Sequence, residues 1–384
     1  MRARYPNERF VDRALVRKLK SRLKPRYRPL TVDTARTQLD AFLSSKLDGA
    51  FEVLDLLPLA GGASKEQFSF RLRWHENDTP RDERLVLRMQ PEQATVETHR
   101  QREFQALQVL SGFIPVPEPY WLDGEAEIFQ QPALIYGFCH GVVRPPDADA
   151  AYTVRGGFGS KWRAILAPQF IDILAQIHTF DHSGKDLSAF DIPAAGNTEA
   201  IILGLNLWQR SWEEDRIEAI PLMTLAAQWL RENAPPVDHV SMVHCDYRGG
   251  NFLFDLDSGK ITAILDWECV RFGDRHEDLA LLMSPALSDY DSDGTQLVGG
   301  FCPREEFIAR YEAKSGLVVD PLRLAYYELY IYWRSVVMCI GSGLRCAVAQ
   351  KSHQDIVVAF NSILGGLMLG DLHKALEKAM KHGT

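Results

Sequence analysis

The sequence predicts an α+β fold in two lobes: a small antiparallel β lobe with one key helix, and a larger lobe that is mainly helical. Short apolar strand patterns gather within residues 51–145, whereas long stretches with helical spacing run from residue 162 to the C-terminus. At 384 residues the chain exceeds one average domain. We therefore expect a basic arm and leading helix over 1–48, a small lobe and linker over 49–145, and a large lobe over 146–384.

The first 32 residues form a strongly basic arm. They hold eleven Lys and Arg against two acidic residues, so the arm carries +9 and the remainder −17. Apolar residues recur in it every four positions, at Val11, Leu15, Leu19 and Leu23. This spacing predicts a short amphipathic helix, packed on the acidic body of its own or a partner subunit. Contact with a membrane surface or a nucleic acid, or a transit-like role, is the alternative. A second helix is expected over 31–47.

The small lobe is expected to hold strands at 51–58, 68–74, 84–89 and 132–138, with one helix after the third strand. The turn between the first two strands contains Gly61, Gly62 and Ser64. Adjacent glycines let backbone amides approach a polyphosphate, and the serine adds a hydroxyl donor. We assign these three residues to a nucleotide site; a plain hairpin connection is the alternative.

The large lobe is predicted to contain helices at 162–180, 201–217, 222–233, 277–283, 304–314, 321–339 and 354–380. Trp208 and Trp212 lie one helical turn apart, which is typical of core residues and would also suit the wall of an apolar acyl site. The acidic run at 213–215 is typical of a solvated helix face; attraction of a polycation is the alternative.

Residues 243–268, VHCDYRGGNFLFDLDSGKITAILDWE, carry the most informative pattern in the chain. Asp246 and Asn251 lie five residues apart on a tight loop between two short strands, and Asp266 follows a third apolar strand. Phosphoryl transfer from ATP needs a carboxylate that orients and deprotonates the attacking hydroxyl, and oxygen ligands that hold magnesium on the phosphates. These three residues supply that set in order, whereas any one Asp alone would indicate a turn or a cap.

Three segments resemble the aminoglycoside phosphotransferase and choline kinase-like family, which is related to the protein kinases: HCDYRGGNFLFD at 244–255, ILDWE at 264–268 and GDRHEDLALL at 273–282. The likeness runs from about Phe51 to the C-terminal helices. Within the family, LVLRMQP at 85–91 and the helix that ends in AAQWLRENAPP are most similar to the kinase-like domain found fused to, or encoded beside, acyl-CoA dehydrogenases. The resemblance implies a bilobal protein-kinase-like fold and ATP-dependent phosphotransfer.

The family resemblance also implies roles for individual residues. Asp246 would orient the substrate hydroxyl and take its proton late, and Arg248 would reach the transferring phosphate. Asn251 and Asp266 would bind Mg2+. His244 precedes the turn and is expected to brace the loop instead of acting as a base.

Three neighbours of this motif receive less specific expectations. Asp278 would accept hydrogen bonds from the backbone of the catalytic loop, beside the simpler role of a helix N-cap. Glu268 is expected to lie near the metal or the substrate without binding the metal directly; a carboxylate at the start of a helix is the alternative. Cys245 stands where the family usually has glycine, and the sequence gives no physical reason for that change.

The small lobe would complete the nucleotide site. Kinase-type folds present a cation to the α- and β-phosphates at the end of the third strand, where this chain has Arg88 and the wider family more often has lysine. Glu103 shares a helical face with two leucines, so we choose it over Glu97 as the partner of Arg88. A surface ion pair of Glu103 with Arg100 is the alternative.

The linker between the lobes is expected near 135–139, where backbone groups would bind a purine edge. Tyr136 and Phe138 are its assigned residues. ATP is the expected nucleotide, with GTP as a second option, and Mg2+ is the expected metal.

Composition favours a cytoplasmic enzyme. The N-terminus lacks the apolar core of a secretory signal, and no apolar run approaches the roughly 20 residues that span a bilayer. Six scattered cysteines without a CxxC pair indicate reduced thiols and no zinc site. We expect a small-molecule kinase that is not integral to a membrane and has no nucleic-acid partner; a homodimer is compatible with these features.

The favoured acceptor is a hydroxyacyl-CoA or a related hydroxylated metabolite, because of the closer resemblance noted above. An aminoglycoside or other antibiotic is the first alternative. Two alternatives belong to other classes: a nucleotide-binding pseudokinase that regulates a partner, and a nucleic-acid or membrane-binding module built on the basic arm.

Overall fold

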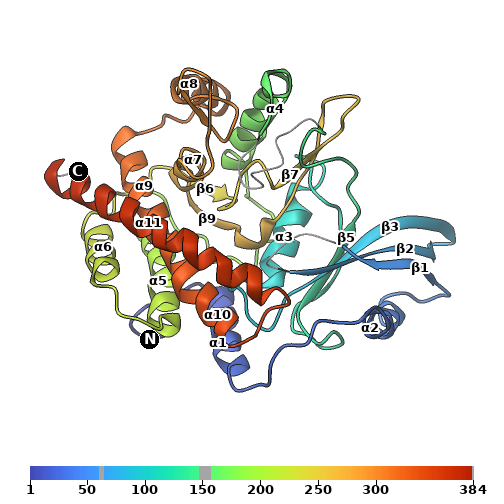
Figure 1. Cartoon of the computed structure of the whole chain (residues 1–384). Coiled ribbons are helices and arrows are strands. Elements are labelled where there is room, and N and C mark those ends of the chain that lie inside the picture. The colour runs from blue at the N-terminus through green and yellow to red at the C-terminus, as the bar shows by residue number, and fades with distance from the viewer. Residues whose placement is uncertain (60–64, 147–156, 383–384) are drawn as a thin grey trace.

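Five antiparallel strands form the sheet of the small lobe, in the spatial order β1-β2-β3-β5-β4 (Figure 1). They are β1 (Glu52–Pro58), β2 (Glu66–Glu76), β3 (Thr79–Met89), β4 (Pro119–Asp123) and β5 (Ala133–Gly137). This computed structural model describes residues 1–59, 65–146 and 157–382. The predicted α+β class, with a small antiparallel β lobe and a larger helical lobe, is confirmed.

The two faces of this sheet pack against different helices. These helices are α2 (Val32–Ser44) and α3 (Arg100–Leu110). Strand alternation places Phe68 and Leu87 in one apolar core with α2. The opposite face carries Arg88 and Tyr136 toward α3, which lies between the sheet and the large lobe (Figure 1). A slip of one residue in the β3 register would therefore turn Arg88 away from the lobe interface.

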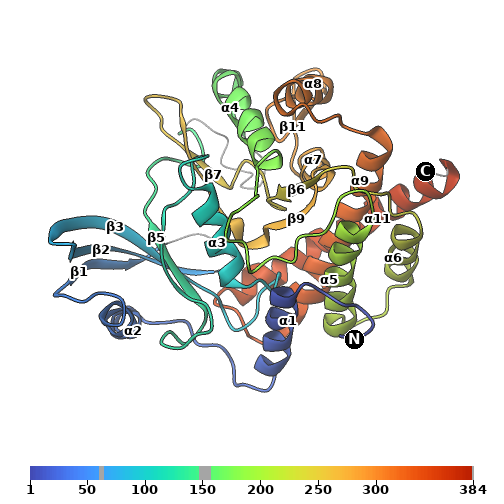
Figure 2. The ribbon, with the colours of Figure 1, turned by 180° about the vertical axis from the view of Figure 1, so that it is seen from behind.

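Helices build most of the large lobe (Figures 1 and 2). They are α4 (Ser160–His178), α5 (Glu199–Asp215), α6 (Pro221–Glu232), α7 (His276–Leu282), α8 (Arg304–Ser315), α9 (Pro321–Val336), α10 (Leu344–Val348) and α11 (Asp355–His382), with a π-helical stretch at Val337–Gly343. Each helix predicted for this lobe has a counterpart here.

Short strands in the large lobe hold the predicted catalytic segment. They are β6 (Val240–Val243), β7 (Phe252–Phe254), β8 (Ile261–Ile264), β9 (Arg271–Asp274), β10 (Asp289–Tyr290), β11 (Gln296–Val298) and β12 (Cys302–Pro303), with a 3-10 turn at Trp267–Cys269. β7 pairs with β8, while β6 pairs with the unpredicted β9. The two ladders fix both ends of the loop between β6 and β7.

The basic arm docks on the large lobe of its own chain. α1 (Arg9–Ser21) buries Leu15 and places the ammonium of Lys18 at 3.0 Å from Asp215 and 3.1 Å from Glu214 of α5. Figure 2 shows α1 beside α5. The favoured interpretation of the arm is therefore confirmed. Glu214 and Asp215 are neither a solvated face nor a site for a polycation, because they are buried against the arm.

Trp208 and Trp212 are core residues. Both are buried and belong to the main apolar core of the large lobe. Trp212 is enclosed by protein. Trp208 also lines a cavity of about 40 Å³ beside Cys245, which is too small for an acyl chain.

The last helix, α11, corrects one expectation about membrane segments. Within the described parts of the chain, Asp355–Lys381 is the one helix long and apolar enough, by length and composition, to cross a membrane. The prediction that no apolar segment approaches this length was wrong. Asn361, Ser362 and three glycines interrupt the apolar residues, so the sequence shows no continuous apolar run although the helix as a whole is apolar. α11 nevertheless packs on α9 and buries Leu372 in the main core.

Candidate active site

The loop between β6 and β7 is anchored by a buried carboxylate. Asp278, in the first turn of α7, accepts the backbone N–H of His244 at 2.8 Å and of Cys245 at 2.7 Å. The same carboxylate also contacts a histidine, because Nε2 of His178 lies 3.2 Å from Oδ2 of Asp278. Burial opposes ionisation of Asp278, but these hydrogen bonds outweigh it and lower the pKa of the carboxyl. The hydrogen bonds expected of Asp278 are thus present.

His244 connects the loop to the end of β8. Its Nε2 lies 2.8 Å from the carbonyl of Leu265, and its Nδ1 accepts the N–H of Asp246 at 3.2 Å. The N–H of Leu265 in turn donates to the carbonyl of Asn251 at 2.8 Å. His244 therefore braces the loop as predicted, since both ring nitrogens are engaged with backbone.

Asp246 forms a hydrogen-bonded unit with its predicted partners. The amide nitrogen of Asn251 donates to Oδ2 of Asp246 at 2.6 Å and to its carbonyl at 2.8 Å. Nε of Arg248 donates to Oδ1 at 2.9 Å. Asp246 remains partly exposed, with about a third of its side chain open to solvent. A hydroxyl could therefore reach a carboxylate whose orientation is already fixed.

Asp266 follows β8 in a left-handed backbone conformation, with φ of 64°. The guanidinium of Arg88 donates to its carboxylate. Burial opposes ionisation of Asp266, but the charge of Arg88 outweighs it, with help from Lys65 and Arg248, and lowers the pKa to about 2. Asp266 is therefore an anion at neutral pH, which suits a ligand of magnesium.

Arg88 belongs to a buried cluster of alternating charges between the lobes. Its Nε lies 3.5 Å from Glu103, and Arg100 also contacts Glu103. Glu268 lies 3.5 Å from Arg100 and 2.5 Å from the ammonium of Lys65. With Asp266 included, three cations face three carboxylates. We call this set the charge cluster; its members are Lys65, Arg88, Arg100, Glu103, Asp266 and Glu268. Pairing every member offsets the cost of removing these charges from water.

Sequence reasoning found only part of the charge cluster. Glu103 lies beside Arg88, and the alternative contact with Arg100 is present as well. Glu97 precedes α3 and accepts the N–H of Ala94 at 3.0 Å instead. Lys65 and Glu268 were not connected, because their 203-residue separation leaves no local pattern.

Tyr136 lies in β5 and Phe138 follows that strand, in the segment expected to be the linker. Tyr136 is buried, its hydroxyl lies 3.3 Å from Gln67, and burial raises its pKa to about 12. The Phe138 ring lies under the guanidinium of Arg84 at 3.9 Å. The N–H of Phe138 donates to the carbonyl of Arg84 at 2.9 Å, so this amide is not available to a purine.

The glycine-rich turn predicted to approach the phosphates, with Gly61, Gly62 and Ser64, lies outside the described residues.

The residues expected to bind magnesium offer a suitable donor set. Across residues 1–59, 65–146 and 157–382, no group of three or more His, Cys, Asp or Glu side chains is arranged to hold a metal. Magnesium bound to ATP needs fewer, because it keeps water and phosphate oxygens as ligands. Asn251 uses its amide nitrogen on Asp246, which leaves its amide oxygen for a metal, and Asp266 adds an anionic oxygen. The residues present therefore fit the ion.

The backbone at Cys245 has a conformation that favours glycine. Cys245 has φ of 65°, in the left-handed region where a Cβ atom is disfavoured and glycine is not. Its carbonyl accepts from Arg334 at 3.0 Å, which helps to hold this conformation.

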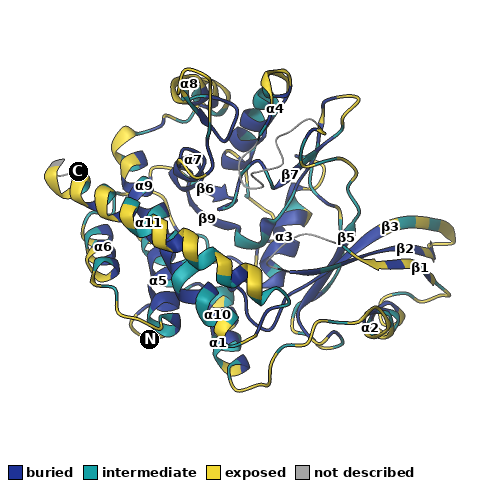
Figure 3. Ribbon diagram, viewed as in Figure 1, coloured by how far each residue is buried: buried dark blue, intermediate teal, exposed yellow. Residues whose placement is uncertain are grey.

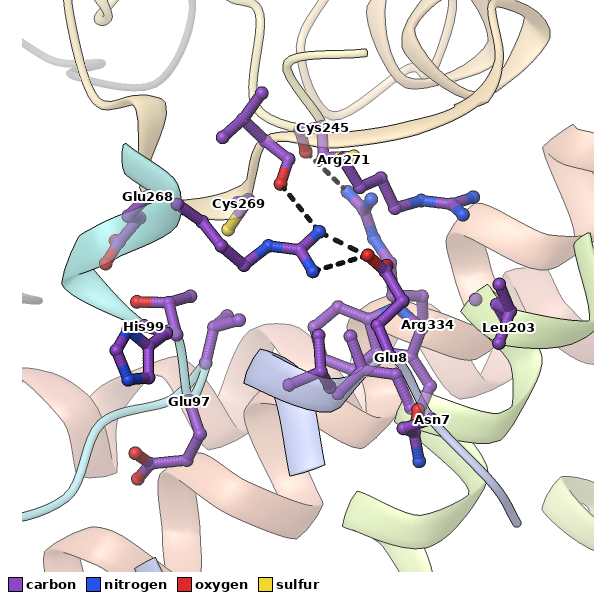
Figure 4. Close-up of a pocket in the computed structure, with 18 of the residues that line it drawn as sticks. Asn7, Glu8, Glu97, His99, Leu203, Cys245, Glu268, Cys269, Arg271 and Arg334 are labelled. Carbon is purple, nitrogen blue, oxygen red and sulfur yellow. Dashed lines mark hydrogen bonds and ion pairs between the residues drawn. The ribbon is translucent and has the colours of Figure 1, made fainter. Parts of the chain in front are cut away.

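A small internal cavity lies behind Cys245 (Figure 4). It has a volume of about 40 Å³ and is also lined by Cys269, Glu268 and Arg102. Arg102, one of these lining residues, donates to Glu8 of the arm at 2.6 Å. The cavity has room for about one ordered water and not for an acceptor.

Replacing Cys245 by Gly is expected to change the free energy of unfolding by less than about 1 kcal/mol, because relief of the left-handed backbone offsets the lost burial of the thiol. Cys245→Val should destabilise the protein by about 2 kcal/mol or more, since a β-branched residue tolerates this backbone poorly. Urea unfolding of both variants, with Cys245→Ala as the matched control, measures the difference. Equal stability of the Val and Gly variants would disprove the backbone explanation.

Replacing Arg88 by Ala is expected to raise the KM for ATP by roughly 10- to 150-fold, the loss of a charge-assisted contact worth about 1.5 to 3 kcal/mol. The KM for the acceptor should change less. Arg88→Lys should rescue partly, since it restores the charge without the guanidinium fork. Glu103→Gln is the matched control for loss of the partner, and thermal unfolding checks that the variants fold. Equal, small effects on both substrates would mean that another cation, such as Lys65, holds the nucleotide.

Comparison with known proteins places this site in a family. Residues 55–327, more than half of the chain, match the phosphotransferase enzyme family. Acyl-CoA dehydrogenase family member 10 of Mus musculus is 25% identical over 313 residues, which cover 78% of this chain and 27% of the mouse protein. Family member 11 of Gallus gallus is 31% identical over 111 residues, covering 29% of this chain and 14% of that protein. The chain thus spans about a quarter or less of the length of these relatives.

Solved structures share the kinase-like fold. A Ralstonia eutropha protein named provisionally as an aminoglycoside phosphotransferase superposes with a TM-score of 0.61 at 20% identity, over 88% of this chain and 98% of that one. A macrolide 2'-phosphotransferase of type I gives a TM-score of 0.52 at 17% identity, over 86% and 96%. The resemblance stated from the sequence is confirmed by these matches. The chain therefore belongs to the phosphotransferase enzyme family.

Proposed function

We propose that this protein transfers the γ-phosphate of ATP to a hydroxyl group of a small molecule. The observation that carries the proposal is the placement of Asp246, Asn251 and Asp266 at the ends of two small ladders. Asn251 donates to Asp246, and hydrogen bonds join this loop to the backbone of Leu265, the residue before Asp266. Arg88 reaches the same place from the other lobe. Phosphoryl transfer depends chiefly on positioning and charge neutralisation, and both are built into this arrangement.

Each residue has a role that follows from its contacts. Asp246 is held by Asn251 and Arg248, so one carboxylate oxygen can orient the attacking hydroxyl and accept its proton late in the reaction. Arg248 can stabilise charge on the transferring phosphate, since its Nε alone is engaged with Asp246. Arg88 can contact the α- and β-phosphates with its remaining donors.

Asn251 and Asp266 would hold magnesium through their side-chain oxygens. When bound, the ion neutralises phosphate charge. Asp266 and Arg88 are bonded to each other in this structure, so the proposed metal ligand and the proposed phosphate-binding cation lie side by side.

For the acceptor, we infer a hydroxyacyl-CoA or a related hydroxylated metabolite. Support comes from the two relatives named as acyl-CoA dehydrogenase family members. An antibiotic acceptor is the second candidate, supported by the shared fold with a macrolide phosphotransferase. The burial of Glu214 and Asp215 removes one acidic surface that would have favoured a polycationic antibiotic.

A screen for acceptor-dependent ADP release by the purified protein tests this proposal. The panel sets hydroxyacyl-CoAs against aminoglycosides, macrolides, choline and homoserine, each with ATP and with GTP. We expect turnover with ATP and a hydroxyacyl-CoA. Turnover with an antibiotic alone would reject the acceptor but keep the reaction. Magnesium-dependent ATP binding without turnover on any acceptor would indicate a pseudokinase.

A further inference from the structure

The outward face of α11 exposes a row of large apolar side chains. Its inner face is buried at Val358, Leu372 and Leu376. Its outer face carries Ile356, Phe360, Ile363 and Leu367, which are 87%, 63%, 58% and 68% exposed. The spacing of four, three and four residues places these side chains on one side of the helix. Figure 3 shows the exposed residues of α11 on the face toward the viewer.

This exposure is unusual for a helix of such composition. Less than a fifth of the most apolar stretch of α11 is buried. Gly366 and Gly370 add to the open face, because a Cβ atom at either position would meet no heavy atom within 4 Å. Contiguous apolar side chains on a protein surface mark a site of interaction with a partner or a membrane.

A basic segment adjoins the start of α11. The N–H of Tyr27 donates to the carbonyl of Gln350 at 3.0 Å, and the ammonium of Lys351 donates to the carbonyl of Ser21 at 2.9 Å and of Pro25 at 2.8 Å. These bonds tie residues 20–28 to the loop that leads into the helix.

The basic segment 20–28 contains five Lys and Arg and no acidic residue. Lys20, Lys24, Arg26 and Arg28 are exposed, and Leu23 between them is 93% exposed. Among the described residues, only Lys24 of these four cations has a carboxylate within 4 Å, that of Glu92. Within the segment, Arg22 pairs with Asp215 of α5 and Lys24 pairs with Glu92. The other three cations, Lys20, Arg26 and Arg28, have no carboxylate partner among the described residues, so their charge remains available to a partner outside the molecule.

Charge decides between a second copy and a membrane as the occupant of this surface. Lys374, Lys378 and Lys381 continue the outward row at the far end of α11, where Lys374 and Lys381 pair with Asp371 and Glu377. A parallel pair of copies would bring the two basic segments together. An antiparallel pair would bring each basic segment to the lysines of the other copy. Like charges disfavour both arrangements, whereas an anionic surface complements the cations.

We propose that the outward face of α11 and the basic segment 20–28 form a peripheral binding surface for membranes that contain acidic lipids. The apolar side chains enter the boundary between headgroups and acyl chains, and the cations bind the lipid phosphates and carboxylates. α11 stays packed on α9, so the helix lies on the membrane and does not cross it.

Sedimentation of the full chain with vesicles tests the proposal. We expect binding to vesicles of equal parts phosphatidylcholine and phosphatidylserine, and none to phosphatidylcholine alone. Binding should weaken as salt rises above about 0.15 M, where charges are screened beyond about 8 Å. Binding that ignores acidic lipid and salt would contradict the role of the basic segment.

Two variant pairs assign the binding to this surface. The double variant Arg26→Ala, Arg28→Ala should weaken vesicle binding by about 30-fold, because each cation near an anionic surface raises the affinity by roughly fivefold. Phe360→Ser with Leu367→Ser should abolish it. The matched controls are Lys185→Ala and Leu57→Ser, which remove an exposed cation and an exposed apolar side chain elsewhere.

Light scattering of the same samples measures their mass and tests the alternative that α11 joins two copies of the chain. We expect the same mass for the wild type and the Phe360→Ser, Leu367→Ser variant. A wild-type dimer that this variant dissociates, together with no vesicle binding, would overturn the proposal and make α11 an interface between copies of the chain.

Discussion

The Asp246→Asn variant is expected to lose turnover by roughly 10² to 10⁴-fold while it retains binding of magnesium and ATP. The amide keeps the shape of the side chain, and its oxygen can still accept from Arg248. Asn251 loses its bond to the second carboxylate oxygen but keeps its bond to the backbone carbonyl of residue 246. The amide cannot accept the proton of the attacking hydroxyl. Asp246 is also partly exposed and is not a member of the charge cluster, so the variant should fold normally.

Single-turnover phosphate transfer and calorimetric titration of ATP measure these two effects separately. Asp257→Asn is the matched control, because Asp257 lies exposed in the turn between β7 and β8. Transfer near the wild-type rate in Asp246→Asn would remove this residue from the reaction.

The Asp266→Ala variant is expected to lose magnesium-dependent ATP binding by about 100-fold or more, since it removes a direct ligand and even outer-shell changes cost 10- to 100-fold. ATP binding without magnesium should fall little. Asp266→Asn keeps one oxygen without the charge and should give an intermediate value. If calorimetry found unchanged affinity in Asp266→Ala, the metal site would have to lie elsewhere.

Local patterns were enough to predict the loop between β6 and β7 and most helices. Asp246 and Asn251 are five residues apart, and the strands beside them are adjacent in sequence, so spacing alone brings them together. The apolar periodicity of α5 and α9 likewise depends on near neighbours. The role of Asp278 as an acceptor of hydrogen bonds from the loop backbone could be predicted as well, because the family resemblance implies it.

Ion pairs between segments distant in the sequence could not be predicted, because they depend on long-range packing. The pairing of Lys65 with Glu268 and the docking of Lys18 on Asp215 join segments about 200 residues apart. Opposite charges on distant segments have many conceivable partners, and only the folded chain selects among them. The positive φ of Cys245 was also hidden, because cysteine is not a residue that signals a left-handed turn.

Transfer of label from ATP marked in its γ-phosphate tests the central claim most directly. The wild type and Asp246→Asn would be incubated with magnesium and a hydroxylated acceptor or a pool of small metabolites, and the label followed by chromatography. We predict that the wild type moves the label to a small molecule in an ester stable to mild acid, and that Asp246→Asn does not. Tight magnesium-dependent ATP binding by the wild type, with no label leaving ATP for any hydroxylated compound, would contradict the account.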